Sequence, residues 1–308
     1  MTATAEVTLE RREVVPLRRT AAGLWSDAWY RLRRDRVTMA ALAVIVLLIL
    51  VSLAAPIFEE LVFRYKFDQQ DLLHAYNPPT LDPIYYIFGA DEIGRSQAVR
   101  LLYGGRVSLG VGFAAASLQL TIGVGLGLAA GYLRGRIDEL VIFVITVLNS
   151  IPQIFLLLIV ASLFAPGPLP LIGIISVLGW TQITNFVRGQ TLSLREREFI
   201  TAAKTIGATT PRVLFRHLLP NVMPLIIVLA AIDVGTIMLL EAALSFLGLG
   251  IQPPIPSWGN MLTNATQYFF RGGHLVVTPG FLIFMTVLCL YLVGDGLRDA
   301  LDPRLKTH

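Results

Sequence analysis

The stretch TMAALAVIVLLILVSLAAP, from Thr38 to Pro56, carries no charge and is long enough to cross the hydrocarbon core of a bilayer as one helix. It begins too far from Met1, and runs too long, for a typical cleaved signal peptide, so we expect a retained first membrane span. Five more apolar stretches follow, at about Val107–Tyr132, Leu140–Phe164, Leu171–Val187, Val222–Leu249 and Val276–Gly294. The sequence therefore predicts an all-α integral membrane protein with six transmembrane helices.

The composition agrees with a membrane protein and excludes several other classes. Hydrophobic residues make up 55% of the 308 residues, charged residues make up 15%, and the mean hydropathy is +0.67. A soluble domain is about 25% charged and could not bury this much apolar side chain. A soluble enzyme, a disordered chain and a disulfide-rich secreted module are therefore excluded. The single cysteine, Cys289, allows no intramolecular disulfide and no cysteine metal cluster.

The positive charges predict how the spans are oriented. If the N-terminus is cytoplasmic, the cytoplasmic segments contain 19 of the 25 lysines and arginines, and the external segments contain 6. Such an excess marks the cytoplasmic side, so we expect both termini in the cytoplasm. The expected segments outside the core are a cytoplasmic tail with an interfacial amphipathic helix at 1–37, an extracytoplasmic segment at 57–101 and a cytoplasmic tail at 298–308.

Two features inside the spans predict how the helices pack. Gly123, Gly127 and Gly131 lie four residues apart, which gives a smooth face along which another helix can approach closely. Pro152 lies inside the third span, where it frees a backbone carbonyl and favours a kink.

No pattern of catalytic or metal-binding residues is present in the sequence. The only lysines are Lys66, Lys204 and Lys306, and none follows a phosphate-binding glycine loop. The four histidines form no His-Glu-x-x-His pair, and there is no Gly-x-Ser-x-Gly elbow. We therefore expect no metal site, no cofactor bound by this chain, and no ATP hydrolysis by this chain alone. An intramembrane enzyme has no catalytic constellation to support it.

The cytoplasmic segment between the fourth and fifth spans contains signals for two short helices. Ser193 followed by Glu196 fits a capping box, and the helix it starts would end at Gly207 in a left-handed conformation. Pro211 fits the first turn of a second helix, which we expect Pro220 to end. The segment therefore predicts a helix–turn–helix elbow that projects into the cytoplasm, where it could dock into a groove of another protein.

The spacing Thr201-Ala-Ala-x3-Gly207-x9-His217-Leu-Leu-Pro220 resembles the EAA loop of ATP-binding-cassette importer permeases, above all the C-type dipeptide and oligopeptide permeases. The resemblance extends over nearly all of the chain from about residue 20. Further matching runs are Gly89–Arg95, Leu102–Leu109, Val187–Gln190, Glu241–Pro254, Ser257–Asn260 and Gly294–Arg304. Two positions depart from the family pattern, because Thr201 replaces the usual loop glutamate and Ser96 replaces an aspartate; Glu198 lies one turn before Thr201.

The resemblance implies a type I importer transmembrane domain, with a permease core at 102–297 and an ATPase-coupling loop at 188–221. It implies as partners a second permease in a heterodimer, two ATPase subunits that hydrolyse the ATP, and an extracytoplasmic solute-binding protein, with no nucleic acid. The location implied is the cytoplasmic (inner) membrane of a prokaryote. The coupling residues implied are Glu198, Thr201, Ala202, Ala203, Gly207, His217, Leu219 and Pro220.

Polar side chains inside the spans are candidates for a translocation path. Buried acids in a membrane helix are costly and by default indicate a pathway or a relay. For Glu241, which fits the family pattern, a hydrogen bond to the partner permease is the alternative, and for Pro152 and its neighbours the alternative is a static packing kink. The candidate residues are Asn149, Gln153, Gln182, Asn185, Asp233 and Glu241.

The transported solute is open at this point, because no side chain identifies it. Family likeness favours peptides over nickel or another small solute. An ion-coupled secondary transporter is the rival from another class, although it would need inverted repeats or a charged midplane site. Asp233 and Glu241 are a thin basis for ion coupling.

Overall fold

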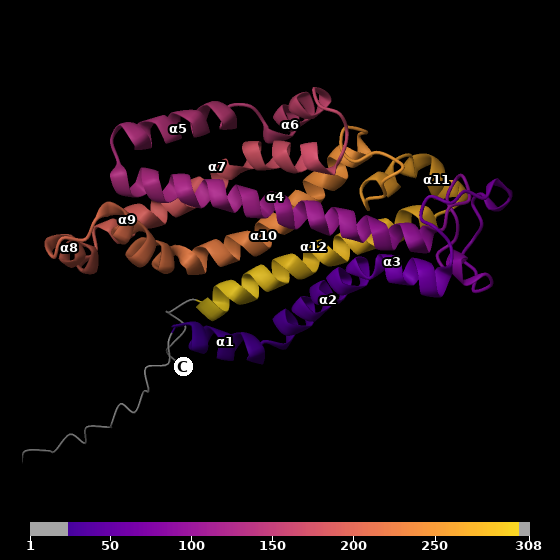
Figure 1. Cartoon of the computed structure of the whole chain (residues 1–308), viewed down its shortest axis with the longest axis horizontal. Coiled ribbons are helices and arrows are strands. Elements are labelled where there is room, and N and C mark those ends of the chain that lie inside the picture. The colour runs from indigo at the N-terminus through magenta and orange to yellow at the C-terminus, as the bar shows by residue number, and fades with distance from the viewer. Residues whose placement is uncertain (1–23, 302–308) are drawn as a thin grey trace, which may run out of the picture.

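The computed structural model describes residues 24–301 and places long helices side by side along one axis (Figure 1). Five helices in this part of the chain are long and apolar enough to cross a membrane. They are α2 (Arg36–Leu53), α4 (Gln97–Leu133), α7 (Pro168–Arg195), α10 (Leu219–Phe246), which follows directly on α9 and η4, and α12 (His274–Leu301). Between residues 24 and 301 the only strand-like pairing is an isolated bridge between Ala90 and Ser96. The all-α prediction is confirmed.

The third expected span is broken. Helix α5 (Arg136–Asn149) and helix α6 (Gln153–Ser162) meet at an angle of 83°, and only as a pair do they provide the sixth span. Pro152 lies at the start of α6, where it has no amide hydrogen to give and restricts the residue before it to an extended conformation. The predicted kink is therefore a full break in the helix.

Helices α4 and α7 pack closely through the predicted glycine face. A Cβ atom added to Gly127 would lie 2.8 Å from the Cβ of Val187, and one added to Gly131 would lie 2.7 Å from the Cβ of Thr191. Only glycine allows the two helices to approach this closely, so the glycine face sets the distance between α4 and α7. Helix α10 then packs between α4 and α12, and the main hydrophobic core lies among these helices.

Short elements form the two ends of the bundle (Figure 1). One end contains α8, α9 and the adjoining π-helix η4, and the other contains the segment from α3 to the start of α4, with α11 beside it. Helix α1 (Leu24–Arg34) packs Ala28 and Leu32 against Ala300 and Leu301 at the end of α12. The bounds of the short elements are α3 Ala55–Ile57, η1 Phe58–Phe63, η2 Leu72–His74, η3 Ile84–Tyr86, α8 Glu198–Thr205, α9 Thr210–Arg212, η4 Val213–Leu218, η5 Asn260–Leu262 and α11 Ala265–Arg271.

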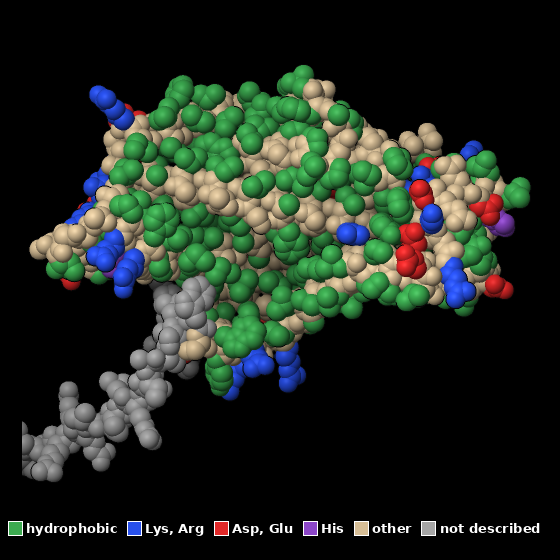
Figure 2. All heavy atoms as spheres, viewed as in Figure 1, with side chains coloured by type: hydrophobic (Ala, Val, Ile, Leu, Met, Phe, Trp, Pro, Cys, Tyr) green, Lys and Arg blue, Asp and Glu red, His purple; other side chains and the backbone are tan. Residues whose placement is uncertain are grey.

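The surface agrees with a molecule that is embedded in a bilayer. Figure 2 shows hydrophobic side chains over the middle of the molecule and most charged side chains gathered at its ends. The first span begins two residues earlier than expected, at Arg36, and α4 begins at Gln97, inside the segment expected to be extracytoplasmic. Of the two tails expected at 1–37 and 298–308, residues 1–23 and 302–308 lie outside the described residues.

Candidate functional site

The elbow that the sequence predicts occupies residues 196–218, and its first helix is α8. Gly207 ends this helix with a φ of +84°, and the amide of Ala208 donates to the carbonyl of Ala203 at 3.0 Å. The left-handed end predicted at Gly207 is confirmed. Because only a residue without a Cβ atom adopts this conformation at little cost, Gly207 fixes the direction in which the chain turns back.

The expected start of the first elbow helix is wrong. Helix α7 continues through Arg195, so Ser193 lies inside α7 and Glu196 lies at its C-terminal end. Thr191 is fully buried against α4, and Leu194 packs beside the hydrophobic core of the elbow. This packing keeps the chain helical past Ser193, because tertiary contacts override a local capping preference.

The second elbow helix begins as predicted but does not end at Pro220. Helix α9 has Pro211 in its first turn, and the chain then stays helical through η4 into α10. Pro220 provides no amide hydrogen and its ring crowds the carbonyl four residues earlier, and the wider π-turn of η4 accommodates this crowding. The Asn221 side chain donates to the carbonyl of His217 at 2.6 Å.

The elbow has a small buried core and an exposed apolar rim. Ile200, Val213 and Leu218 are completely buried, whereas Ile206 is 85% exposed and Phe215 is 67% exposed. Ile206 lies at the C-terminal end of α8 and Phe215 lies in η4. The sequence did not single them out, because the same segment contains apolar residues that are buried, such as Ile200 and Val213.

The structure brings most of the predicted coupling residues to the surface of the elbow. Ala203 is buried, and His217 and Leu219 are half-buried. Glu198, Thr201 and Ala202 share a shallow pocket with Glu196, Thr205 and Ile206. The exposed coupling residues are Glu198, Thr201, Ala202, Gly207 and Pro220.

Charged and aromatic side chains join the elbow to the membrane helices. The ring of Tyr132, at the end of α4, has the Lys204 Nζ 5.0 Å and the Arg195 Cζ 5.9 Å from its centre. At the surface, Arg134 pairs with Glu196 at 3.1 Å. The elbow is thus in contact with α4 and α7 through side chains from three elements.

The break between α5 and α6 places polar groups beside α7. Asn149 Oδ1 accepts a hydrogen bond from the Thr181 hydroxyl at 3.3 Å, and Gln153 begins α6. Asn185 lies one turn beyond Thr181 on α7. Four of the predicted path residues, namely Asn149, Gln153, Gln182 and Asn185, are exposed in this chain.

The two membrane acids lie in different surroundings. Asp233 is half-buried, and its Oδ2 is enclosed without a hydrogen-bond partner among the described residues. Glu241 is 1% exposed and accepts hydrogen bonds from Ser108 at 2.9 Å and Ser245 at 2.8 Å. Both Glu241 oxygens are therefore bound within this chain. The bond from Glu241 to a second permease, and its place in the path, stay predictions.

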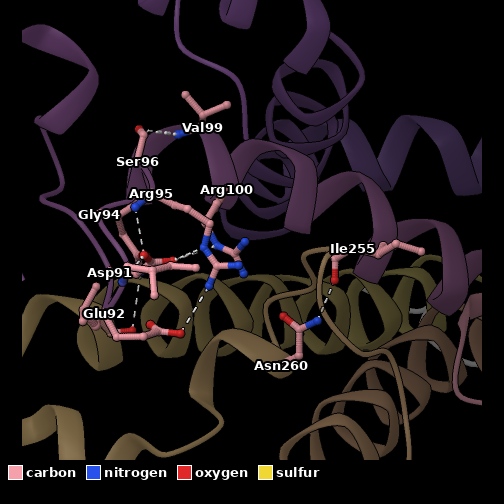
Figure 3. A network of polar contacts seen from close by, with 12 residues as sticks. Asp91, Glu92, Gly94, Arg95, Ser96, Val99, Arg100, Ile255 and Asn260 are labelled. Carbon is pink, nitrogen blue, oxygen red and sulfur yellow. Dashed lines mark hydrogen bonds and ion pairs between the residues drawn. The ribbon is translucent and has the colours of Figure 1, made fainter. Parts of the chain in front are cut away.

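A second polar network lies at the opposite end of the bundle (Figure 3). Asp91 accepts from the Arg95 Nε at 2.6 Å and lies 3.5 Å from the Arg100 Nε, and the Arg95 Nη2 donates to Glu92 at 3.2 Å. Asp91, Arg95 and Arg100 are all buried. Ser96 accepts from the amide of Val99 at 3.3 Å and so caps α4. The family departure at Ser96 therefore keeps a residue type that caps helices well.

Two tyrosines bind the backbone of the loop that contains this network. The hydroxyls of Tyr65 and Tyr86 each donate to the carbonyl of Gly94 at 3.0 Å. Burial raises the pKa of both tyrosines, so both hydroxyls remain protonated donors at any physiological pH. Gly94 has a φ of +77°, and an added Cβ there would overlap the backbone of Asp71. Within residues 24–301, no cluster of three or more histidine, cysteine or acidic side chains could hold a metal ion.

The helical order, the broken third span and the elbow define the membrane subunit of a binding-protein-dependent importer. Residues 123–307 match the family model described as "Binding-protein-dependent transport system inner membrane component", and residues 23–79 match "N-terminal TM domain of oligopeptide transport permease C". The chain belongs to this family of inner membrane components.

Characterised relatives cover almost the whole chain. The oligopeptide transport system permease protein OppC of Bacillus subtilis is 38% identical over 92% of this chain and 90% of its own length. The dipeptide transport system permease protein DppC of the same species is 37% identical over 96% of this chain and 91% of its own length. The glutathione transport system permease protein GsiD of Escherichia coli O6:K15:H31 is 38% identical over 92% of this chain and 91% of its own length.

Among solved structures, an inward-facing conformation of the MetNI methionine ABC transporter resembles this fold. Its TM-score is 0.55 at 20% identity, and the match covers 66% of this chain and 96% of that chain. This similarity concerns the fold alone. The family and the relatives together identify the chain as a membrane-spanning transport permease with the expected type I importer fold.

Proposed function

We propose that this chain is one permease subunit of an ATP-driven peptide importer. In the assembly, a second permease completes the translocation path, two ATPase subunits bind at the cytoplasmic end, and a solute-binding protein delivers peptide from outside. The observation that carries the proposal is the elbow, with its exposed apolar rim at one end of a membrane bundle. ATP is hydrolysed by the partner subunits, and this chain binds no cofactor of its own.

The elbow is the docking site for an ATPase subunit in this proposal. Ile206 and Phe215 are the apolar anchors, and Glu198 and Thr201 line a shallow pocket together with Ile206. Closure of the ATPase pair on ATP moves the elbow as a lever, and α4, α7 and α10 follow it. Nucleotide shifts the balance between inward-open and outward-open states only through its different affinity for the two.

The path for the solute runs along the α5–α6 break in this proposal. Backbone groups freed from a membrane helix are tolerated only where protein or water covers them. Asn149 and Gln153 beside the break, with Gln182 and Asn185 on α7, give a polar surface that a peptide backbone can use. Asp233, whose carboxylate has an oxygen without a partner, is a further candidate for the path.

Peptides are the proposed solute because the relatives named above serve oligopeptide, dipeptide and glutathione transport systems. Nickel or another small solute is the alternative within the same mechanism. The proposed location is the cytoplasmic membrane of a prokaryote, with both termini inside, because 19 of 25 basic residues then lie on the cytoplasmic side.

The decisive experiment purifies this chain from its native membrane and identifies the proteins that remain bound. We expect an ATPase and a second permease. The complex is then reconstituted with its binding protein in liposomes, and uptake of a labelled tripeptide is measured with and without ATP. Uptake that needs no nucleotide and collapses with the ion gradient would contradict the proposal and favour a secondary transporter. ATP-dependent uptake of Ni²⁺ without peptide would correct the solute alone.

A further inference from the structure

Tyr132 lies where three elements of the molecule meet. It belongs to the last turn of α4, Arg195 is the last residue of α7, and Lys204 lies near the end of α8 in the elbow. Both cations approach the same ring, with the Lys204 Nζ at 5.0 Å and the Arg195 Cζ at 5.9 Å from the centre. These distances are within the range in which an aromatic ring attracts a cation.

The surroundings make the ring the main partner of both cations. Neither Lys204 nor Arg195 forms an ion pair with a described residue. The Arg195 Nη1 is shielded from solvent and has no hydrogen-bond partner in the described part of the chain. The Tyr132 ring is therefore a contact that the end of α7 and the elbow have in common.

The other side of Tyr132 is fixed to the elbow core. The ring is half-buried and packs beside the core that contains Ile200, Val213 and Leu218. One turn earlier in α4, Leu128 belongs to the same core. The backbone of Tyr132 therefore moves with α4, while its ring is held by the elbow and by α7.

We propose that Tyr132 is a positioning residue that transmits movement of the elbow to α4 and α7. This inference rests on the proposed function, because it concerns how ATP closure reaches the membrane helices. When the ATPase pulls the elbow, Lys204 moves with it, and the shared ring makes α4 and α7 follow. Without the ring this contact is lost, less of the elbow movement reaches α4 and α7, and less peptide is imported for each ATP hydrolysed.

The test compares Tyr132→Phe, which keeps the aromatic face, with Tyr132→Leu, which keeps apolar bulk but offers no face to a cation. Both are measured in the complete importer in liposomes as peptide imported per ATP hydrolysed. Tyr132→Phe retains the wild-type ratio. Tyr132→Leu lowers it about threefold to tenfold, the range expected for losing cation–π contacts of this kind. Equal ratios for wild type and Tyr132→Leu, or equal losses in both variants, would overturn the inference.

Lys204→Gln provides a second test on an exposed side chain that the fold does not need. Introduced into the wild type, this change should lower the amount of peptide imported per ATP hydrolysed. Introduced into Tyr132→Leu, it should cause no further decrease, because the two residues act through one contact. Independent losses that add up would contradict a shared contact.

A third readout does not depend on transport. Amide hydrogen exchange of α8 is measured in the purified chain in lipid nanodiscs, and we expect faster exchange in Tyr132→Leu but not in Tyr132→Phe. If the wild type shows no ATP-dependent uptake, the proposed function fails, while the exchange result still decides whether the ring holds the elbow. Unchanged exchange in Tyr132→Leu would overturn the inference by itself.

Discussion

The buried network around Asp91 and the ion pair at the elbow differ in how far water reaches their charges. At the end that contains the start of α4, Arg95 forms an ion pair with Asp91, and the two side chains are 9% and 6% exposed. At the elbow, Arg134 forms an ion pair with Glu196, and these side chains are 49% and 66% exposed. A buried ion pair stabilises one arrangement, because separating its partners leaves a charge that neither water nor a partner compensates. An exposed ion pair separates at little cost in free energy, because water solvates both charges. The Asp91 network therefore resists rearrangement more strongly than the Arg134–Glu196 pair does, which agrees with the proposed role of the elbow as the moving part.

Both ends of the bundle expose large apolar side chains, among them Leu73 at 94% and Ile206 at 85%, but the apolar residues at the buried network are enclosed. Near the buried network, Trp258 is 1% exposed, and its ring nitrogen donates to the carbonyl of Leu101 at 2.9 Å. Its amide donates to Ser108, which also donates to Glu241. In the elbow, by contrast, Ile206 and Phe215 point large apolar side chains into solvent. The buried network is thus enclosed by its own chain, whereas the two elbow side chains lie open at the surface.

Removing Asp91 is expected to give the largest effect. Asp91→Ala leaves Arg95 and Arg100 buried without their shared carboxylate, and breaking a buried pair in this way costs about 3–5 kcal/mol. The free energy of unfolding is measured by SDS titration of the purified chain in mixed micelles. Glu92→Gln is the matched control, because Glu92 is about one third exposed and its loss is expected to cost roughly 1 kcal/mol or less. Equal losses would show that the network is not a buried one.

The contact between α4 and α7 joins the two ends, and it can be tested at single glycines. Gly127→Ala places a Cβ atom 2.8 Å from Val187, and overpacking of this kind costs about 1–3 kcal/mol. Gly125→Ala is the control two residues away, where no atom lies within 4 Å of the added carbon. The same titration should show a loss for Gly127→Ala and none for Gly125→Ala. An equal loss in both variants would mean that the contact at Gly127 does not decide stability, because alanine is a better helix former than glycine and propensity alone predicts no loss.

Much of the fold could be predicted from the sequence, because apolar stretch length and glycine spacing report directly on membrane helices. The 83° break at Pro152 was predicted only as a kink, since its size depends on what packs around the freed backbone. Pro220 was expected to end a helix, yet the π-turn of η4 absorbs it. The bonds of Glu241 to Ser108 connect positions 133 residues apart, and no local pattern predicts such a contact.

The elbow was located from the sequence by its motif, and its left-handed end at Gly207 followed from one glycine. Its exposed rim could not be derived, because a helical segment with Ile206 and Phe215 could equally bury them in the fold. The same limit applies to Tyr132, since its two cations come from other elements, 63 and 72 residues further along the chain. Contacts of this kind depend on how α4, α7 and α8 meet in three dimensions.

Charging the rim of the elbow sharpens the comparison between the ends. Ile206→Asp is expected to leave stability within about 0.5 kcal/mol of the wild type, because the side chain is exposed. It should nevertheless reduce co-purification of the ATPase at least about tenfold, since an apolar anchor at an interface is commonly worth about 2 kcal/mol. Leu73→Asp is the control, an exposed apolar residue at the other end. Undiminished recovery of ATPase with Ile206→Asp would remove the rim from the docking surface.

The smallest effect is expected from restoring the glutamate that the family usually has in the loop. Thr201 is exposed, so Thr201→Glu adds a charge that water already solvates, and a new exposed ion pair contributes about 1 kcal/mol at most. ATPase binding should therefore strengthen no more than about fivefold, as measured by titration of ATPase onto the permease in nanodiscs. Thr205→Glu, one turn further along the same exposed face, is the control for added charge. A much larger gain specific to Thr201→Glu would mean that the docked carboxylate is buried against a cation. The elbow would then resemble the opposite end once its partner is bound, and the contrast between the two ends would hold only for the free chain.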